Sequence, residues 1–282
     1  MTAAPRPDSY SSESVNLAPG PWEAAGDHQV RRSRRGSDET RPTLSTMSNP
    51  VIIIVGAGPG VGAATARKFA AAGYDIGLIA RNAQRLQAFA AELEKEDANV
   101  GWAAVDIADP TALTETLRRM TDHTGRVDVL VHNAVAFRAT PATELTAEQL
   151  LADLGAGSAS LLTAVQAVLP VLRQQHTGTI IATGSGAADH PNVSAASLGV
   201  QKAALRNLIQ TLASELAGEG IHVATVTVRG AIAEGTPFSP AAIADVFAGL
   251  VAETSTDQAN WHTLLNLTKD GVSELTKGGV PQ

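Results

Sequence analysis

Residues 51–62 read VIIIVGAGPGVG, and this stretch decides the fold of the chain. The β-branched run at 51–55 predicts a buried strand, and an apolar pattern with helical spacing begins at Ala63. Glycines between the two permit positive φ angles and a close backbone approach, while the helix N-terminus offers unpaired N–H groups and the positive end of its dipole. A glycine-rich turn placed between strand and helix therefore predicts a binding site for the phosphates of a dinucleotide.

The same pattern of a short apolar run followed by a longer helical stretch repeats along the chain. This alternation is typical of parallel α/β architecture. We therefore expect a single-domain α/β fold, with a Rossmann-type doubly wound parallel sheet between two layers of helices. The predicted strands are 51–55, 75–80, 100–106, 127–132, 179–183 and 222–228.

Capping signals predict where several helices begin and one ends. Gly218, after a long helical stretch over about 194–217, is the expected left-handed C-cap. The predicted N-terminal signals are Asp109 before Pro110, Ser239 before Pro240, and the capping box of Thr146 with Gln149.

Residues 1–46 are rich in Ser, Pro, Glu and Arg and lack a periodic apolar pattern. We interpret them as a disordered extension and assign the domain to residues 47–282, with Met47 as a plausible true start. The basic run at 31–35 suggests an export signal or a basic contact patch, but no apolar segment of signal length follows it, which favours a solvated tail.

Composition limits the classes of function. The 282 residues carry a net charge of −7, so binding to nucleic acid or to an anionic membrane has no electrostatic source. The chain has no cysteine, which excludes thiolate metal sites and cysteine nucleophiles and is compatible with a cytoplasmic location. The apolar run at 51–55 is too short to span a bilayer. We expect a soluble, cytoplasmic protein with a small-molecule substrate, no bound metal, and no nucleic-acid or membrane partner.

The end of the second predicted strand indicates which dinucleotide is bound. An acidic residue at this point would pair with the ribose 2′-hydroxyl of NAD, but Ala80 carries no such group. Arg81 can pair with the 2′-phosphate of NADP, and Asn82 or Arg85 could assist. The sequence therefore favours NADP(H), the alternative being that Arg81 is a solvent-facing arginine.

From Val51 to about Leu267 the chain resembles the short-chain dehydrogenase/reductase family. Gly56, Gly60 and Gly62 match its spaced glycines. The resemblance also implies the remaining cofactor contacts: Gly58 and Val61 in the same turn, Asp106 toward the adenine amino group, and Asn133 with Ala134 in a segment similar to the family's Asn-Asn-Ala-Gly signature, where Val135 replaces the glycine.

The resemblance implies a catalytic serine and lysine and reveals a missing tyrosine. Ser185 resembles the serine that orients the substrate, and Lys202 resembles the lysine that lowers the tyrosine pKa and holds the ribose. Four residues before Lys202, where the family has its proton-donating tyrosine, the chain has Leu198. Its two tyrosines, Tyr10 and Tyr74, lie in the tail and before the second strand, away from the expected site.

Other positions also depart from the family pattern. The helix asparagine of the family aligns with Gly157, and Arg229 stands where the family has a proline near the nicotinamide. Arg229 could bind a substrate carboxylate or phosphate, reach the cofactor pyrophosphate, or lie on the surface. His190 is a possible substitute proton donor, and Asp189 beside it is also titratable, although an exposed loop histidine is the plainer interpretation.

Three functions fit this sequence. The first is an NADP-dependent oxidoreductase, with a proton donor other than tyrosine or a substrate that needs none from it. The second is a catalytically silent NADP-binding sensor or partner subunit, and the third is a non-redox enzyme, such as a cyclase or dehydratase, on the same fold. The helices around 146–172 and 194–217 correspond to those through which family members associate, which implies a homodimer or homotetramer.

Overall fold

The computed structural model describes residues 49–275. The predicted disordered extension at 1–46 and Met47 lie outside the described residues. One eight-stranded sheet has the order β3-β2-β1-β4-β5-β6-β7-β8, in which only β8 pairs antiparallel. Its strands are β1 (Val51–Val55), β2 (Asp75–Ala80), β3 (Val100–Ala104), β4 (Val129–His132), β5 (Gly178–Ser185), β6 (Ile221–Val228), β7 (Leu264–Thr268) and β8 (Gly271–Glu274).

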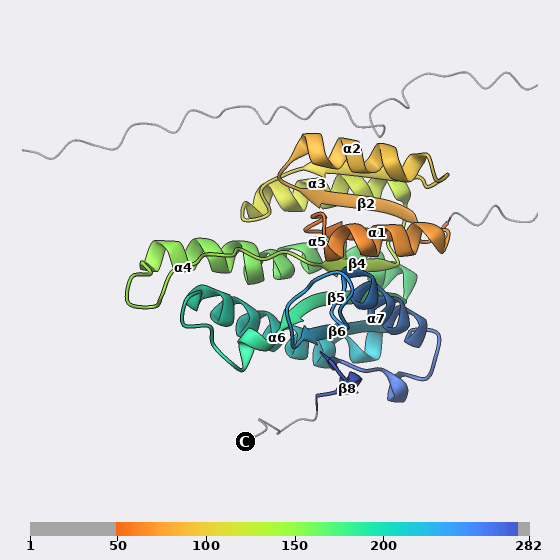
Figure 1. The fold of residues 1–282 in the computed structure, drawn as a ribbon. Helices are drawn as coiled ribbons and strands as arrows, with labels where there is room; N and C mark the ends of the chain where they lie inside the picture. The colour runs from red at the N-terminus through yellow and green to blue at the C-terminus, as the bar shows by residue number, and fades with distance from the viewer. Residues whose placement is uncertain (1–48, 276–282) are drawn as a thin grey trace, which may run out of the picture.

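Helices cover both faces of the sheet, so the predicted three-layer Rossmann-type architecture is confirmed (Figure 1). Side chains of β1 alternate between two apolar cores, one closed by α3, α5 and α6 and the other by α1, α2 and α7. The helices are α1 (Val61–Ala71), α2 (Ala83–Glu94), α3 (Pro110–Thr124), α4 (Ala147–Leu154), α5 (Ser160–Gln175), α6 (Ala196–Leu216) and α7 (Pro240–Glu253).

The predicted helix starts are confirmed. The Asp109 carboxylate accepts hydrogen bonds from the amides of Thr111 and Ala112, the Ser239 hydroxyl caps α7, and Thr146 with Gln149 forms a complete capping box. The C-cap prediction at Gly218 was wrong. A short 3-10 turn over Ala217–Glu219 continues from α6, and the left-handed residue is Gly220, with φ 77°. A Cβ on Gly220 would lie 2.4 Å from the carbonyl oxygen of His176, so this position also requires the absence of a side chain.

A single apolar helical run spans Ala147–Gln175, because the π-helical turn η1 (Gly155–Ala159) joins α4 to α5. By length and composition alone this run could cross a membrane, and within the described residues no other helix could. Its α5 part packs inside the protein, where Leu161, Val165 and Val168 are fully buried against the sheet. Packing in the core accounts for the apolar composition of α5.

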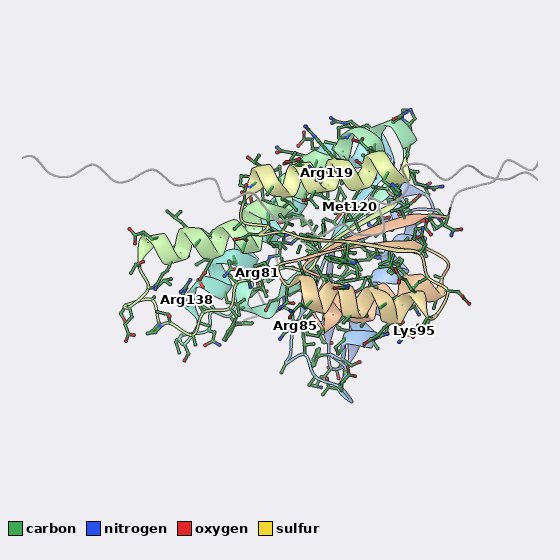
Figure 2. All side chains as sticks on the ribbon, turned by 90° about the horizontal axis from the view of Figure 1, so that it is seen from above. Arg81, Arg85, Lys95, Arg119, Met120 and Arg138 are labelled. Atoms are coloured by element: carbon green, nitrogen blue, oxygen red, sulfur yellow. The ribbon has the colours of Figure 1, made fainter. Side chains whose placement is uncertain are left out.

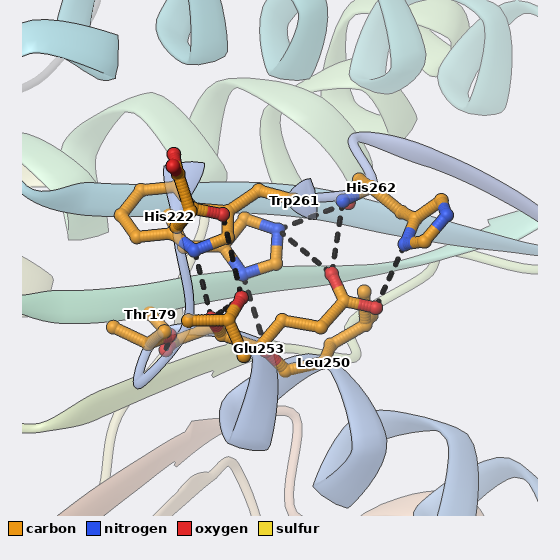
Figure 3. A network of polar contacts seen from close by, with 9 residues as sticks. Thr179, His222, Leu250, Glu253, Trp261 and His262 are labelled. Carbon is orange, nitrogen blue, oxygen red and sulfur yellow. Dashed lines mark hydrogen bonds and ion pairs between the residues drawn. The ribbon is translucent and has the colours of Figure 1, made fainter. Parts of the chain in front are cut away.

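At the N-terminal end of β6, a buried polar network ties three elements together (Figure 3). The two ring nitrogens of His222 lie 3.1 Å and 3.0 Å from the carbonyl oxygens of Leu250 and His262. Trp261 stacks on the His222 ring and donates its indole N–H to the carbonyl oxygen of Glu253. The network thereby joins β6, the end of α7 and the segment that leads into β7.

Candidate cofactor and active site

The glycine turn opens into a cavity at the carboxyl ends of the strands. The order β3-β2-β1-β4-β5 reverses direction between β1 and β4, and in doubly wound sheets ligands bind at such a switch point. A cavity of about 290 Å³ lies there. Its lining comes from the turn, the ends of β2 and β4 and the segment after β3, and includes Gly56, Gly58, Ala80, Arg81, Asp106, Asn133, Ala134 and Val135.

The glycines of the turn serve two different needs. Gly56 has φ 93°, and a Cβ there would lie 2.7 Å from the amide nitrogen of Ala134. A Cβ on Gly62 would lie 2.7 Å from the carbonyl oxygen of Gly56, so α1 can begin this close to β1 only with glycine. Positions 58 and 60 face open space instead, and no side chain caps α1. The first turn of α1 therefore presents a bare backbone of the kind that accepts a pyrophosphate.

Arg81 lies beside the cavity at the start of α2. Asn82 caps this helix by accepting a hydrogen bond from the Arg85 amide, so the side-chain oxygen of Asn82 has a structural partner within the same turn. Figure 2 shows Arg81 and Arg85 at the same end of α2, with Lys95 at the other. Arg81 is exposed and lines the cavity next to Ala80, and the lining includes no acidic residue from β2 or the start of α2. These residues fit an anionic group on the ribose better than a free 2′-hydroxyl.

Asp106 and Asn133 line the other walls of the cavity. Asp106 is exposed, and its carboxylate accepts a hydrogen bond from the Ala108 amide. The Asn133 amide group donates to the Gly56 carbonyl oxygen at 3.0 Å and accepts from the Thr183 hydroxyl at 2.8 Å. Asn133 thus links the ends of β1, β4 and β5, so the structure gives it a bracing contact that the sequence alone did not indicate.

The structure brings Ser185 and Lys202 to the same end of the sheet. Ser185 ends β5, and its hydroxyl accepts a hydrogen bond from the Ala187 amide. The buried ammonium of Lys202 donates to the Thr183 carbonyl oxygen at 2.8 Å, two residues before Ser185, and lies 3.4 Å from the Ala134 carbonyl oxygen. Burial lowers the pKa of Lys202 to about 8. The ammonium is therefore held by backbone carbonyls between the two halves of the site.

Leu198 lies in the first turn of α6, half-buried. The next residue, Gly199, packs against the turn after β5, where an added Cβ would lie 2.8 Å from the carbonyl oxygen of Ala187. The start of α6 is thus pressed against the segment that carries Ser185. The aliphatic side chain of Leu198 offers this region no exchangeable proton.

A residue that the sequence did not single out, Gln201, fills the space beside Gly157. Its buried side-chain amide accepts from the Ala136 amide at 3.1 Å and donates to the Ala136 carbonyl oxygen at 2.9 Å. An added Cβ at Gly157 would lie 2.0 Å from the Gln201 side-chain oxygen. Gln201 therefore holds the segment after β4 through Ala136. Its own side chain occupies the space that a side chain at position 157 would need. Its position before Lys202 was the only available signal.

A second cavity, of about 470 Å³, lies beyond Ser185. It is lined by Ser185, Gly186, Ala187, His190, Val228, Arg229 and Gly230. His190 is exposed at its rim. Asp189 points elsewhere: its carboxylate is bound by both nitrogens of the Arg206 fork and by Arg229. These arginines hold the pKa of Asp189 below its usual range, which favours its carboxylate form and argues against a role as proton donor.

His132, at the end of β4, is fully buried and has a structural partner. The Ser160 hydroxyl donates to the Ala156 carbonyl oxygen, so the His132 Nε2–H donates to Ser160 at 2.8 Å. Burial and the nearby charge of Lys202 lower the pKa of His132 to about 3. His132 is therefore neutral at physiological pH and has no proton to give as an acid.

Comparison with known proteins agrees with this geometry. Residues 50–237 match the family described as short chain dehydrogenase. An uncharacterised oxidoreductase of Staphylococcus epidermidis is 30% identical over 198 residues, which cover 69% of this chain and 85% of the relative. A protein of Salmonella typhi named NADP-dependent 3-hydroxy acid dehydrogenase is 29% identical, over 67% of this chain and 75% of its own length.

A solved structure is also similar. A crystal structure of a metagenomic short-chain oxidoreductase in complex with NADP superposes with a TM-score of 0.71 at 26% identity, covering 79% of this chain and 99% of that protein. The superposition covers nearly all of the neighbour, so the two proteins share the same fold.

Proposed function

Because this chain belongs to the short-chain dehydrogenase/reductase family of oxidoreductases, we propose that it binds NADP(H) and interconverts a small carbonyl compound and its alcohol. The observation that supports this most directly is the cavity that joins the glycine turn, Arg81, Asp106 and Asn133 at the switch point of the sheet. The cofactor is NADP(H), in keeping with the NADP complex of the similar structure and the printed name of the Salmonella relative.

Each part of the cavity has a role in holding the cofactor. The bare first turn of α1, with Gly58 and Gly60 open in front of it, receives the pyrophosphate. Arg81 pairs with the 2′-phosphate, and Asp106 accepts from the adenine amino group. The Lys202 ammonium lies 3.4 Å from the carbonyl oxygen of Ala134, a residue that lines the cavity. From this position it stabilises the ribose at the nicotinamide end of the cofactor.

When bound, NADPH would supply the hydride that reduces the carbonyl carbon, and the carbonyl oxygen must then gain a proton from the protein. Leu198 has none to give, and the tyrosine among the described residues, Tyr74, directly precedes β2, at the end of the sheet opposite the cavities. Besides Arg229, two side chains that line the second cavity carry exchangeable protons: the Ser185 hydroxyl orients the carbonyl, and the exposed His190 imidazole donates the proton. The substituted site predicts slow turnover, because a positioned general acid contributes roughly 10²–10⁴ in rate.

One specific observation favours a second function. Leu198 removes the family's proton donor while the cofactor cavity keeps its parts, which is also what a silent NADP-binding sensor or partner subunit would show. The subunit would then pair through the faces of α4, α5 and α6, and we propose a homodimer or homotetramer for the enzyme as well. Sedimentation of the purified full chain gives the oligomeric state.

The test has a binding arm and a turnover arm. Fluorescence titration should give tighter binding of NADPH than of NADH, and Arg81→Ala should weaken NADPH by about 10- to 100-fold while changing NADH little, because a hydrogen bond to a charged group contributes about 1.5–3 kcal/mol. Lys95→Ala, at the far end of α2, is the matched control.

Turnover is followed as NADPH oxidation with a panel of ketones, aldehydes and oxo acids. We expect slow oxidation that falls further in Ser185→Ala and in His190→Asn. Binding of NADPH without oxidation by any carbonyl compound would favour the silent protein, and equal affinity for NADPH and NADH would contradict the role of Arg81.

A further inference from the structure

The second cavity contains an anchored positive charge that the hydride transfer itself does not need. Arg229 follows Val228, which pairs in register with Ser185 on the neighbouring strand. An added Cβ on Gly186 would lie 3.7 Å from the Cα of Arg229, so the two backbones are in direct contact. Ser185 at the end of β5 and Arg229 directly after β6 thus line the wall of one cavity.

The guanidinium of Arg229 is held in a fixed position. Its Nε donates to the side-chain oxygen of Asn266 at 2.7 Å, and one terminal nitrogen donates to Asp189 at 2.9 Å. The Arg229 side chain is 19% exposed, so it is neither a freely solvated arginine nor fully covered. An arginine has five N–H donors. Among the described residues only these two contacts engage them, which leaves donors available for a ligand.

The charge of Arg229 is not cancelled by Asp189. Arg206 takes both oxygens of that carboxylate, at 3.0 Å and 2.5 Å, in a two-pronged pair. Two guanidinium groups therefore share one carboxylate, and the cluster keeps one net positive charge. The lining of the cavity includes His190 and Ser185 but no acidic side chain.

We propose that Arg229 binds the carboxylate of the substrate, so that the substrates are oxo acids or hydroxy acids whose carbonyl carbon lies toward Ser185. This inference rests on the proposed function. A carboxylate matches the single net charge and the planar fork of the arginine, whereas a phosphate dianion would leave a negative charge uncompensated. Oxidation or reduction takes place at the carbonyl or alcohol carbon, and the carboxylate is unchanged.

The experiment measures binding separately from catalysis. Straight-chain carboxylates from acetate to hexanoate are titrated into the NADP⁺-bound full chain by saturation-transfer NMR, each beside its primary amide, which has nearly the same shape without the charge. We expect the best acid to bind at least tenfold more tightly than its amide, a difference of about 1.4 kcal/mol.

Three variants assign that preference. Arg229→Gln should abolish it, since Asp189 stays paired with Arg206 and the fold is kept. Arg229→Lys, which retains the positive charge without the planar guanidinium, should keep part of the preference for the acid over its amide. Arg173→Gln is the matched control, because Arg173 forms an exposed pair with Glu219 at the other end of the sheet. NADPH affinity should be the same in all of them.

The results separate this proposal from the proposed function. An acid and its amide that bind equally, acids that bind Arg229→Gln as tightly as the wild type, or no acid binding at tens of millimolar would each overturn the carboxylate site. Loss of NADPH affinity in Arg229→Gln with acid binding intact would overturn it too, by assigning the arginine to the cofactor. Carboxylate binding without any turnover would support the carboxylate site and contradict the proposed oxidoreductase activity.

Discussion

At the scale of single residues, Leu198 is the position on which the proposed chemistry depends most, because its side chain has no exchangeable proton. It lies in the first turn of α6, beside the close contact of Gly199 with the turn that follows Ser185. Lys202 is one helical turn further along, which places residue 198 on the same side of α6. A tyrosine at position 198 would therefore place its hydroxyl on the side of α6 that carries Lys202.

We predict that Leu198→Tyr raises the rate of NADPH-dependent carbonyl reduction. Because a positioned general acid contributes roughly 10²–10⁴, an increase of about 10²-fold in kcat is expected, with little change in NADPH affinity. Leu198→Phe is the matched control, since it adds the ring without the hydroxyl. If the phenylalanine variant gained as much as the tyrosine variant, a proton relay at this position would be disproved.

Lys202 gives a prediction about pH. Burial lowers its pKa to about 8, below the ordinary lysine value of 10.5 that applies to the unfolded chain. Between these two values the unfolded chain binds more protons, so the free energy of unfolding should rise with pH across the window. The cost of the buried charge is fully present below pH 8 and is relieved as pH rises toward 10.5.

Chemical denaturation of the wild type and Lys202→Met at several pH values tests this assignment. The stability of the wild type relative to Lys202→Met should increase between pH 8 and 10.5, by an amount on the order of 3 kcal/mol. Lys95→Met, which removes an exposed lysine, should show no comparable trend. A flat difference for Lys202→Met would mean that the ammonium is better solvated than its burial indicates.

At the scale of secondary-structure elements, the turn η1 depends on one pair of residues. Gly157 lies against Gln201, and an added Cβ would be 2.0 Å from the Gln201 oxygen. Alanine normally stabilises a helix relative to glycine by about 0.5–1 kcal/mol. Here we expect the opposite sign, a loss of roughly 1–3 kcal/mol, because Gln201 must leave its two hydrogen bonds to Ala136.

Urea unfolding of four variants isolates this contact. Gly157→Ala should destabilise, and in the double variant with Gln201→Ala the two costs should not add. Gly249→Ala in α7, where nothing lies within 4 Å of the added Cβ, should be neutral or slightly stabilising. Additive costs at positions 157 and 201 would show that the two side chains do not compete for the same space.

Elements with a strong local signal could be predicted, and those determined by distant contacts could not. The β-branched runs indicated β1, β2 and β6, and Asp109, Thr146 and Ser239 marked three helix starts because a cap is a contact between near neighbours. Strands β7 and β8 were missed, since β7 forms by parallel pairing with β6 and β8 forms by antiparallel pairing with β7. Gln201 was missed for the same reason: Ala136, with which it forms two hydrogen bonds, is 65 residues away.

For the candidate site, the sequence predicted the glycine turn and its neighbours because strand order brings the carboxyl ends together. It could not show that two arginines hold Asp189, which lies 40 residues from Arg229. It also left open whether Arg229 lay on the surface, and only the contacts with Asp189 and Asn266 give that side chain a fixed place.

At the scale of the whole molecule, the two ends of the sheet have separate tasks. The cavities lie at the carboxyl ends of the strands, whereas the His222 network closes the opposite end. Residues 222 and 228 of β6 are about 20 Å apart at strand spacing. A change at His222 should therefore affect stability without affecting the ligand sites.

We predict that His222→Leu lowers the free energy of unfolding by roughly 1–3 kcal/mol, because it leaves one of the two carbonyl oxygens that face the ring, those of Leu250 and His262, without an N–H donor. Loss of the stacking with Trp261 adds to the cost. The same substitution at exposed His190 should change stability by less than about 0.5 kcal/mol. Thermal unfolding, NADPH titration and NADPH oxidation of both variants should distinguish their roles: His222→Leu unfolds earlier and binds NADPH normally, whereas His190→Leu keeps its stability and loses turnover. Weakened NADPH binding in His222→Leu would show that the two ends of the sheet are coupled.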